Sequence, residues 1–146
     1  MSKPLLQVKN LKKYFAKTGG VFSRKIGEIK AVDGISFTVN EGEVFGIVGE
    51  SGCGKSTAAK TILRLLEPTD GEVIFEDQDI TKLSQEKMRQ LRRHMQFVFQ
   101  DPYASLNPRQ RVEKILEEPL IVHGVKDKNE RKRKVQEILE VVGLTK

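Results

Sequence analysis

Cysteine and tryptophan are nearly absent from this sequence of 146 residues, which contains one cysteine and no tryptophan. A single thiol excludes an internal disulfide framework and fits a reducing compartment. No apolar run approaches the ~20 residues of a transmembrane helix. Met1 to Pro4 also lacks the pattern that opens a secretory signal, so we expect no such signal.

The remaining composition is basic and moderately apolar, with a net charge of +6 and 38% hydrophobic residues. The length and apolar content suit one compact domain. The charge permits a polyanionic partner such as nucleic acid, an anionic membrane or a nucleotide, and does not choose among them. A basic run, Arg131 to Lys134, favours nucleic acid, but acidic residues lie near it and no aromatics are interleaved with it. A solvated helix face is the simpler interpretation.

The most informative segment is a glycine-rich loop of the form G-x-x-x-x-G-K-[ST], whose residues are Gly49, Glu50, Ser51, Gly52, Cys53, Gly54, Lys55, Ser56 and Thr57. An apolar run precedes it and a helix-like stretch follows, which is the context that a phosphate-binding loop requires. Glycines let successive N–H groups point at one anion near the positive end of the helix. Lys55 supplies charge for the β and γ phosphates, and the Ser56 hydroxyl is available to Mg²⁺. Thr57 is expected to donate to the α-phosphate.

Periodicity predicts half-buried strands near residues 6–8 and 35–39, separated by a long loop or loose hairpin over Lys17–Lys30. A buried strand, Val44–Val48, is expected to end at the phosphate loop. Further elements are expected along the chain: a helix over Lys55–Leu66, a strand over Glu72–Phe75, a helix capped by Ser84 and running to about Arg93, a strand over Gln96–Phe99, and helices from Arg111 (interrupted near Pro119) and from about Asn129.

Four stretches resemble the ATP-binding subunits of ABC transporters, in the dipeptide/oligopeptide importer branch. They are Val8–Phe15, Ala31–Phe37, the Walker A loop Gly49–Thr57, and Phe97–Arg109, of which the last is the most specific. The resemblance implies an α/β fold: a P-loop NTPase core with an antiparallel β subdomain and the start of a helical subdomain, as an incomplete ABC ATPase domain. Residues 1–100 would form the N-terminal part of the core, and residues 101–146 the beginning of the helical subdomain.

The resemblance also implies roles for residues and partners. Gln100 corresponds to the Q-loop glutamine, which would ligate Mg²⁺ together with Ser56 and move with the transporter's membrane subunits. Phe15 is expected to stack on the adenine of ATP, although the adjacent Tyr14 remains an alternative. The expected partners are a second ATP-binding subunit arranged head to tail and permease subunits contacting Gln100–Arg109, at the cytoplasmic face of the membrane. No nucleic-acid partner is expected.

The sequence departs from the family pattern because the signature, the Walker B strand, the catalytic glutamate and the switch histidine do not occur within residues 1–146. Val73–Asp77 only superficially resembles Walker B and fits a hairpin. The chain is therefore expected to be an N-terminal fragment that cannot hydrolyse ATP alone. Two family strands would normally separate Val44–Val48 from Gln96–Phe99, so these segments are expected about 14 Å apart. A non-catalytic nucleotide-binding or interaction fragment stays open as an alternative.

Overall fold

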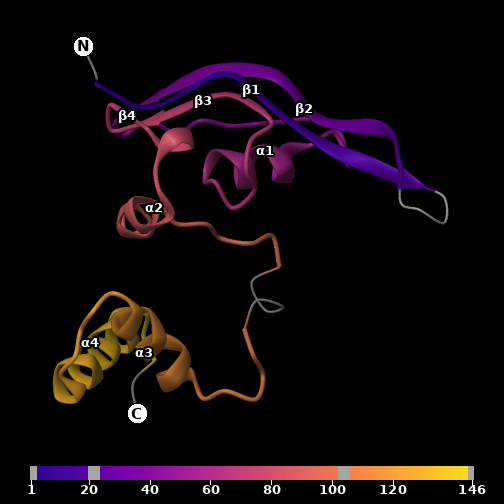
Figure 1. Cartoon of the computed structure of the whole chain (residues 1–146). Helices are drawn as coiled ribbons and strands as arrows, with labels where there is room; N and C mark the ends of the chain where they lie inside the picture. The colour runs from indigo at the N-terminus through magenta and orange to yellow at the C-terminus, as the bar shows by residue number, and fades with distance from the viewer. Residues whose placement is uncertain (1–2, 20–23, 102–105, 145–146) are drawn as a thin grey trace. The chain divides into compact units, whose positions relative to one another are not determined.

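The computed structural model describes residues 3–19, 24–101 and 106–144, which fall into two compact units divided between Phe97 and Val98 (Figure 1). The described part of the first unit contains a sheet, the helix after the phosphate loop, a short 3₁₀ helix and one further short α-helix. The second contains two helices. Part of the segment that carries the importer resemblance, residues 102–105, lies outside the described residues. No described helix is both long and apolar enough to cross a bilayer.

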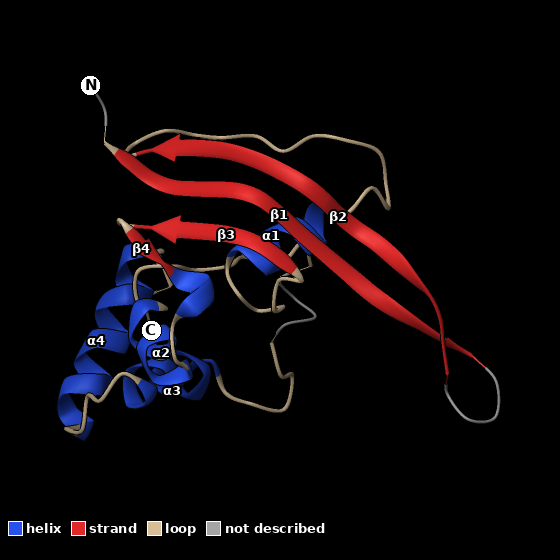
Figure 2. Cartoon of the chain, turned by 45° about the horizontal axis from the view of Figure 1, so that its top comes forward, coloured by secondary structure: helices blue, strands red, loops and turns tan. Residues whose placement is uncertain are grey.

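The sheet has four antiparallel strands in the order β2-β1-β3-β4: β1 Pro4–Gly19, β2 Arg24–Asn40, β3 Asp70–Phe75 and β4 Gln78–Asp79. Strands β1 and β2 form one long hairpin that extends well beyond the end of β3 (Figure 2). The expected loose connection over Lys17–Lys30 is therefore mostly regular strand. A register shift between Lys17 and Thr18, together with the glycines of this segment, weakens the period-two alternation by which a strand is predicted from sequence.

Val73–Asp77 forms part of the hairpin between β3 and β4, as the sequence predicted, and does not form a Walker B strand. Glu76 and Asp77 both have positive φ (48° and 64°), as a two-residue hairpin turn with primed geometry requires. Beyond β4, a short 3₁₀ helix, η1 Ile80–Lys82, leads to α2 Gln85–Leu91. Ser84 caps α2 by accepting from the Lys87 amide, as predicted.

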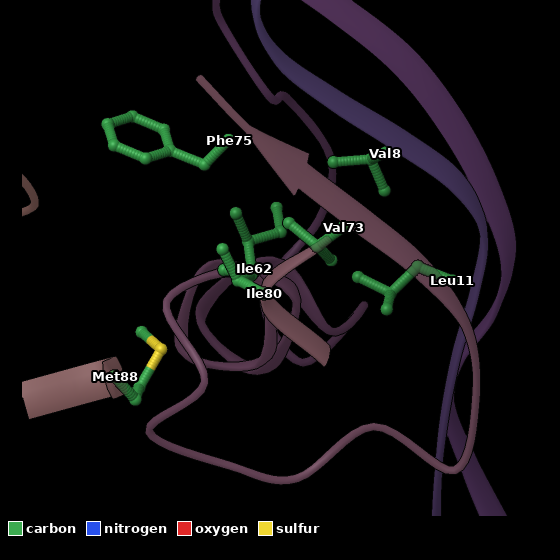
Figure 3. Close-up of a cluster of buried hydrophobic side chains, with 7 residues drawn as sticks. All are labelled: Val8, Leu11, Ile62, Val73, Phe75, Ile80 and Met88. Atoms are coloured by element: carbon green, nitrogen blue, oxygen red, sulfur yellow. The ribbon is translucent and has the colours of Figure 1, made fainter. Parts of the chain in front are cut away.

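The core of the first unit joins the sheet to helix α1, which spans Lys55–Ile62. Its buried side chains come from both strands and helices (Figure 3): Val8, Leu11, Ile62, Val73, Phe75, Ile80 and Met88. Arg64 fixes the end of α1, because its Nη1 donates to the carbonyls of Ile80 (3.0 Å) and Leu83 (2.6 Å). Helix α1 is consequently anchored on the face of the sheet that carries these apolar residues.

Two expected strands are wrong: neither Val44–Val48 nor Gln96–Phe99 forms a strand. Val44 and Val48 are 98% and 91% exposed, so the first segment is not buried either. A strand is maintained by hydrogen bonds to a neighbour, and no strand among the described residues pairs with these segments. The expected 14 Å separation of two strands therefore has no counterpart in this structure. Phe45 is nevertheless placed against β2, with its ring stacked on Phe37 at 4.6 Å.

The second unit is a helical hairpin of α3 Val112–Val122 and α4 Lys128–Val141. Pro119 lies inside α3 without ending it, which corrects the expected interruption. Proline removes one backbone hydrogen bond and crowds the carbonyl four residues earlier, but the helix continues to Val122. Asp127 caps α4 by accepting from the Glu130 amide at 2.7 Å. Arg131 joins the two helices through Glu117 (2.7 Å) and the connecting carbonyls of Val125 and Lys126.

Candidate nucleotide-binding site

The loop before α1 has the backbone that its glycines predict. Gly52 and Gly54 have φ of 82° and 98°, in the left-handed region that favours glycine. A Cβ on Gly54 would also overlap the carbonyl oxygen of Ala31 in β2. This close approach brings the start of α1 against the long hairpin, so the loop and β2 form adjacent parts of one surface.

The N-terminus of α1 is open to an anion. Its cap residue Gly54 offers no side-chain hydrogen bond, and its first turn contains no acidic residue. The amides of the first helical turn lack intrahelical acceptors and carry the positive end of the helix dipole. By contrast, α2 and α4 each have a side-chain cap and an acidic residue in the first turn.

Lys55 points back into the loop that precedes it. Its Nζ donates to the carbonyls of Gly49 (2.7 Å) and Glu50 (2.6 Å) and lies 3.6 Å from the Cys53 sulfur. The ammonium is thus held inside the curl, beside the uncapped helix end. The charge, the glycine geometry and the free amides together fit a phosphate group.

The Ser56 hydroxyl belongs to an exposed residue in the first turn of α1, beside this anion site. Among the described residues, no three His, Cys, Asp or Glu side chains gather into a metal site. A magnesium ion here would therefore depend on hydroxyl, amide and phosphate oxygens, which are ligands that Mg²⁺ accepts. Hydrogen bonding of the Thr57 hydroxyl to the α-phosphate stays a prediction. The Thr57 carbonyl accepts a hydrogen bond from the buried Thr61 hydroxyl at 2.7 Å, which helps fix α1.

Gln100 is exposed and belongs to the second unit. The structure brings together the sequence-predicted residues 49–57, whereas the joint ligation of Mg²⁺ by Ser56 and Gln100 stays a prediction.

The strand register separates Tyr14 from Phe15. Phe15 lies two residues from Lys13 and four from buried Leu11, so it shares their face of β1, the face that packs against α1. Tyr14 lies on the opposite face, where its hydroxyl donates to Asp33 and the Lys30 ammonium sits 5.2 Å from its ring centroid. Phe15 is therefore the aromatic residue on the phosphate-loop side.

The Tyr14–Asp33 pair forms a small charged cluster with Lys30, whose Nζ donates to Asp33 at 3.2 Å. The hydrogen bond from Tyr14, followed by that from Lys30, lowers the pKa of Asp33 below 3.8. The same hydrogen bond raises the pKa of Tyr14 above 10.0. Sequence reasoning missed this cluster because the bulges that align these residues cannot be read from periodicity.

The basic run in α4 is largely engaged with acids. Besides the Arg131–Glu117 bridge, Arg133 pairs with Glu137 (2.5 Å) and Lys134 with Glu130 (3.1 Å). Three of the four basic side chains are paired with carboxylates, which leaves little excess positive charge to attract a phosphate backbone.

Comparison with known proteins reveals a consistent set of relatives. The sequence pattern of the family described as ABC transporter matches residues 32–146. The oligopeptide transport ATP-binding protein AppF of Bacillus subtilis (strain 168) is 52% identical over 141 residues, which is 96% of this chain and 43% of that protein. The glutathione import ATP-binding protein GsiA of Salmonella typhimurium is 47% identical over 141 residues, 97% of this chain and 23% of that protein.

Solved structures show the same fold. A dimeric ATP-binding cassette in a post-hydrolysis state, bound to ADP and Pi, superposes with a TM-score of 0.76 at 30% identity. A dimeric bacterial ABC transporter cassette gives a TM-score of 0.78 at 29% identity. Each match covers 97% of this chain and 59% of the solved chain. The chain thus spans less than half the length of the curated relatives named above, and more of the solved cassettes.

Proposed function

The chain belongs to the ABC transporter family, and from this premise we propose that it forms the nucleotide-binding part of the ATP-binding subunit of a peptide importer. The name of the AppF relative supports oligopeptides as the transported class, and that of GsiA supports glutathione, itself a small peptide. The first name describes transport and the second describes import, and both name an ATP-binding protein. The proposed cargo is therefore a short peptide, carried by other subunits.

The observation that carries this proposal is the phosphate-binding loop. Its left-handed glycines, its inward-pointing Lys55 and the uncapped α1 terminus together fit the triphosphate of ATP. Magnesium would bridge the β and γ phosphates, with Ser56 and Gln100 as its protein ligands and ATP supplying further oxygens. Phe15 would stack on the adenine, since any purine offers a π-face to an aromatic ring.

In the complete subunit, binding energy would be converted into movement. Two ATP-binding subunits would close head to tail over two nucleotides, each loop being covered by the partner's signature segment. Closure would move the permease subunits through the region Gln100–Arg109, at the cytoplasmic face of the membrane. The role of the loop in this cycle is to hold the phosphates in place while the partner subunit approaches.

The proposal is tested by measuring the thermal stability of the chain with and without Mg-ATP. At about a hundred times its dissociation constant, Mg-ATP should stabilise the fold by ~2.7 kcal/mol. Lys55→Ala should abolish most of that shift, because it removes the charge at the centre of the loop. The matched control is Lys60→Ala, at the other end of the same helix, which should keep the shift. Equal shifts for all three proteins would contradict nucleotide binding at this loop.

A further inference from the structure

Arg64, two residues after the end of α1, combines an unusual backbone conformation with a nearly buried charge. Its φ of 50° lies in the left-handed region, which is unfavourable for a residue with a Cβ. Its side chain is only 12% exposed, which is uncommon for an arginine unless the guanidinium is paired. A conformation of this kind persists where the surrounding contacts hold the residue in place, and it points to a specific role.

The guanidinium of Arg64 joins the end of α1 to the start of α2. Its Nε donates to both carboxylate oxygens of Glu67, at 2.9 and 3.2 Å, which fixes its orientation. Its Nη1 donates to the carbonyls of Ile80 at 3.0 Å and Leu83 at 2.6 Å. Leu83 directly precedes Ser84, the residue that caps α2. The side chain therefore holds the backbone at the point where α2 begins.

The backbone of Arg64 contacts the other end of α2. Arg92, which follows the last residue of α2, donates from Nη2 to the Arg64 carbonyl at 3.3 Å. Between these two contacts, Met88 of α2 is buried in the same apolar cluster as Ile62 of α1 (Figure 3). The two helices are thus joined at both ends and in the middle of α2, and Arg64 provides both end contacts.

The opposite end of α1 carries the candidate phosphate site, about 12 Å away along the eight residues of the helix. Elements that open together form one cooperative unit, and a ligand that binds only the closed form stabilises the whole unit. If Arg64 makes α1 and α2 one such unit, a phosphate ligand at α1 also stabilises α2. Along the chain, α2 is followed by the segment that contains Gln100, eight residues after Arg92.

We infer that Arg64 is a positioning residue of the nucleotide site, which locks α2 to α1 so that nucleotide binding at residues 49–57 also stabilises α2. This inference rests on the proposed nucleotide-binding function. Arg64 acts through α1 and does not itself bind the phosphates. No sequence motif marks it, because its contacts join segments that are 16 to 28 residues apart in the chain.

The test measures amide hydrogen exchange in α1 and in α2 with and without Mg-ATP at about a hundred times its dissociation constant. In the wild type, exchange should slow about a hundredfold in both helices, since they open together. Arg64→Gly removes the side chain, and glycine adopts the left-handed backbone without strain. In this variant α1 should still slow about a hundredfold, but α2 by about tenfold or less.

The ratio of the two effects separates coupling from a merely structural role. A residue that only stabilises the fold would change exchange with and without nucleotide alike, and α1 and α2 would still be slowed equally. The matched control is Arg89→Ala, which removes an arginine of α2 that is 66% exposed and lies 3.9 Å from Glu86 of the same helix. Both helices of this variant should be slowed as in the wild type.

A second variant covers the case in which Arg64→Gly does not bind Mg-ATP. Arg64→Asn then replaces it, because asparagine also tolerates the left-handed region and is too short to reach the carbonyls of Ile80 and Leu83. The expected result is the same, with α1 slowed by nucleotide and α2 slowed by about tenfold or less.

The outcomes separate the two claims. If Mg-ATP slows exchange in α1 of the wild type but not in α2, the coupling is overturned and the phosphate loop stands. Slowing of α2 that is as large in the Arg64 variants as in the wild type also overturns it, as does an equal loss in Arg89→Ala. If Mg-ATP slows exchange nowhere in residues 49–57 of the wild type, the proposed function fails, and the coupling with it.

Discussion

Backbone conformation and close contacts restrict which residues can occupy single positions of the phosphate loop. Gly54 combines a left-handed φ of 98° with a contact to the Ala31 carbonyl that excludes any Cβ. A Cβ on Gly49 would lie only 2.7 Å from the Cys53 sulfur, which places the thiol close to the start of the loop. Cys53 is exposed, and it is the one cysteine in the sequence. It therefore reports on the loop without interference from other thiols.

Alkylation of Cys53 should be slowed by nucleotide. If only the nucleotide-free chain reacts, Mg-ATP at a hundred times its dissociation constant should lower the alkylation rate about a hundredfold. The rate is measured by mass spectrometry during reaction with iodoacetamide. In Lys55→Ala the protection should disappear, because the nucleotide no longer binds. Identical rates with and without Mg-ATP in the wild type would argue that the nucleotide does not cover this loop.

At the scale of elements, one arginine joins the two helices of the second unit. Arg131 is only 15% exposed and contacts Glu117 of α3 as well as two carbonyls of the connection between the helices. Arg133, two residues along the same helix, is 62% exposed and pairs with Glu137 in the next turn of that helix. The two arginines thus differ in burial and in what they join.

Arg131→Ala should destabilise the hairpin by about 2 kcal/mol, since it leaves a half-buried carboxylate and two carbonyls without their donor. Arg133→Ala should cost about 0.5 kcal/mol or less, as expected for an exposed pair within one helix. Urea denaturation followed by helical circular dichroism measures both. Equal losses for the two variants would show that Arg131 does not hold the helices together.

The sequence predicted those elements whose determinants are local. The cap at Ser84 and the loop around Lys55 depend on a few adjacent residues, and both are present. The two wrong strands, Val44–Val48 and Gln96–Phe99, have strand-like composition but depend on neighbours that local sequence does not reveal. The long hairpin was underestimated because bulges shift its register.

At the scale of the whole molecule, apolar side chains remain exposed in segments that have a strand-like sequence. Val44, Val48 and Val98 are 98%, 91% and 85% exposed. The chain also spans less than half of the curated relatives reported above, so the activity of a complete subunit cannot be assigned to these residues alone.

The 146-residue chain by itself should show negligible ATP turnover. No carboxylate in it corresponds to the family's general base, and such a base typically contributes 10²–10⁴-fold to the rate. Phosphate release is measured with the purified chain at saturating Mg-ATP. Turnover equal to that of a full-length ATP-binding subunit, and lost in Lys55→Ala, would show that a base is present among residues 1–146.

The central claim, that residues 49–57 bind nucleotide phosphates, is tested most directly by amide hydrogen exchange with and without Mg-ATP. Exchange reports local opening residue by residue, so it locates the ligand as well as detecting it. The account predicts slower exchange in the loop and the first turn of α1, no change in α4, and loss of the effect in Lys55→Ala. Unchanged exchange across residues 49–57 at saturating Mg-ATP would contradict it.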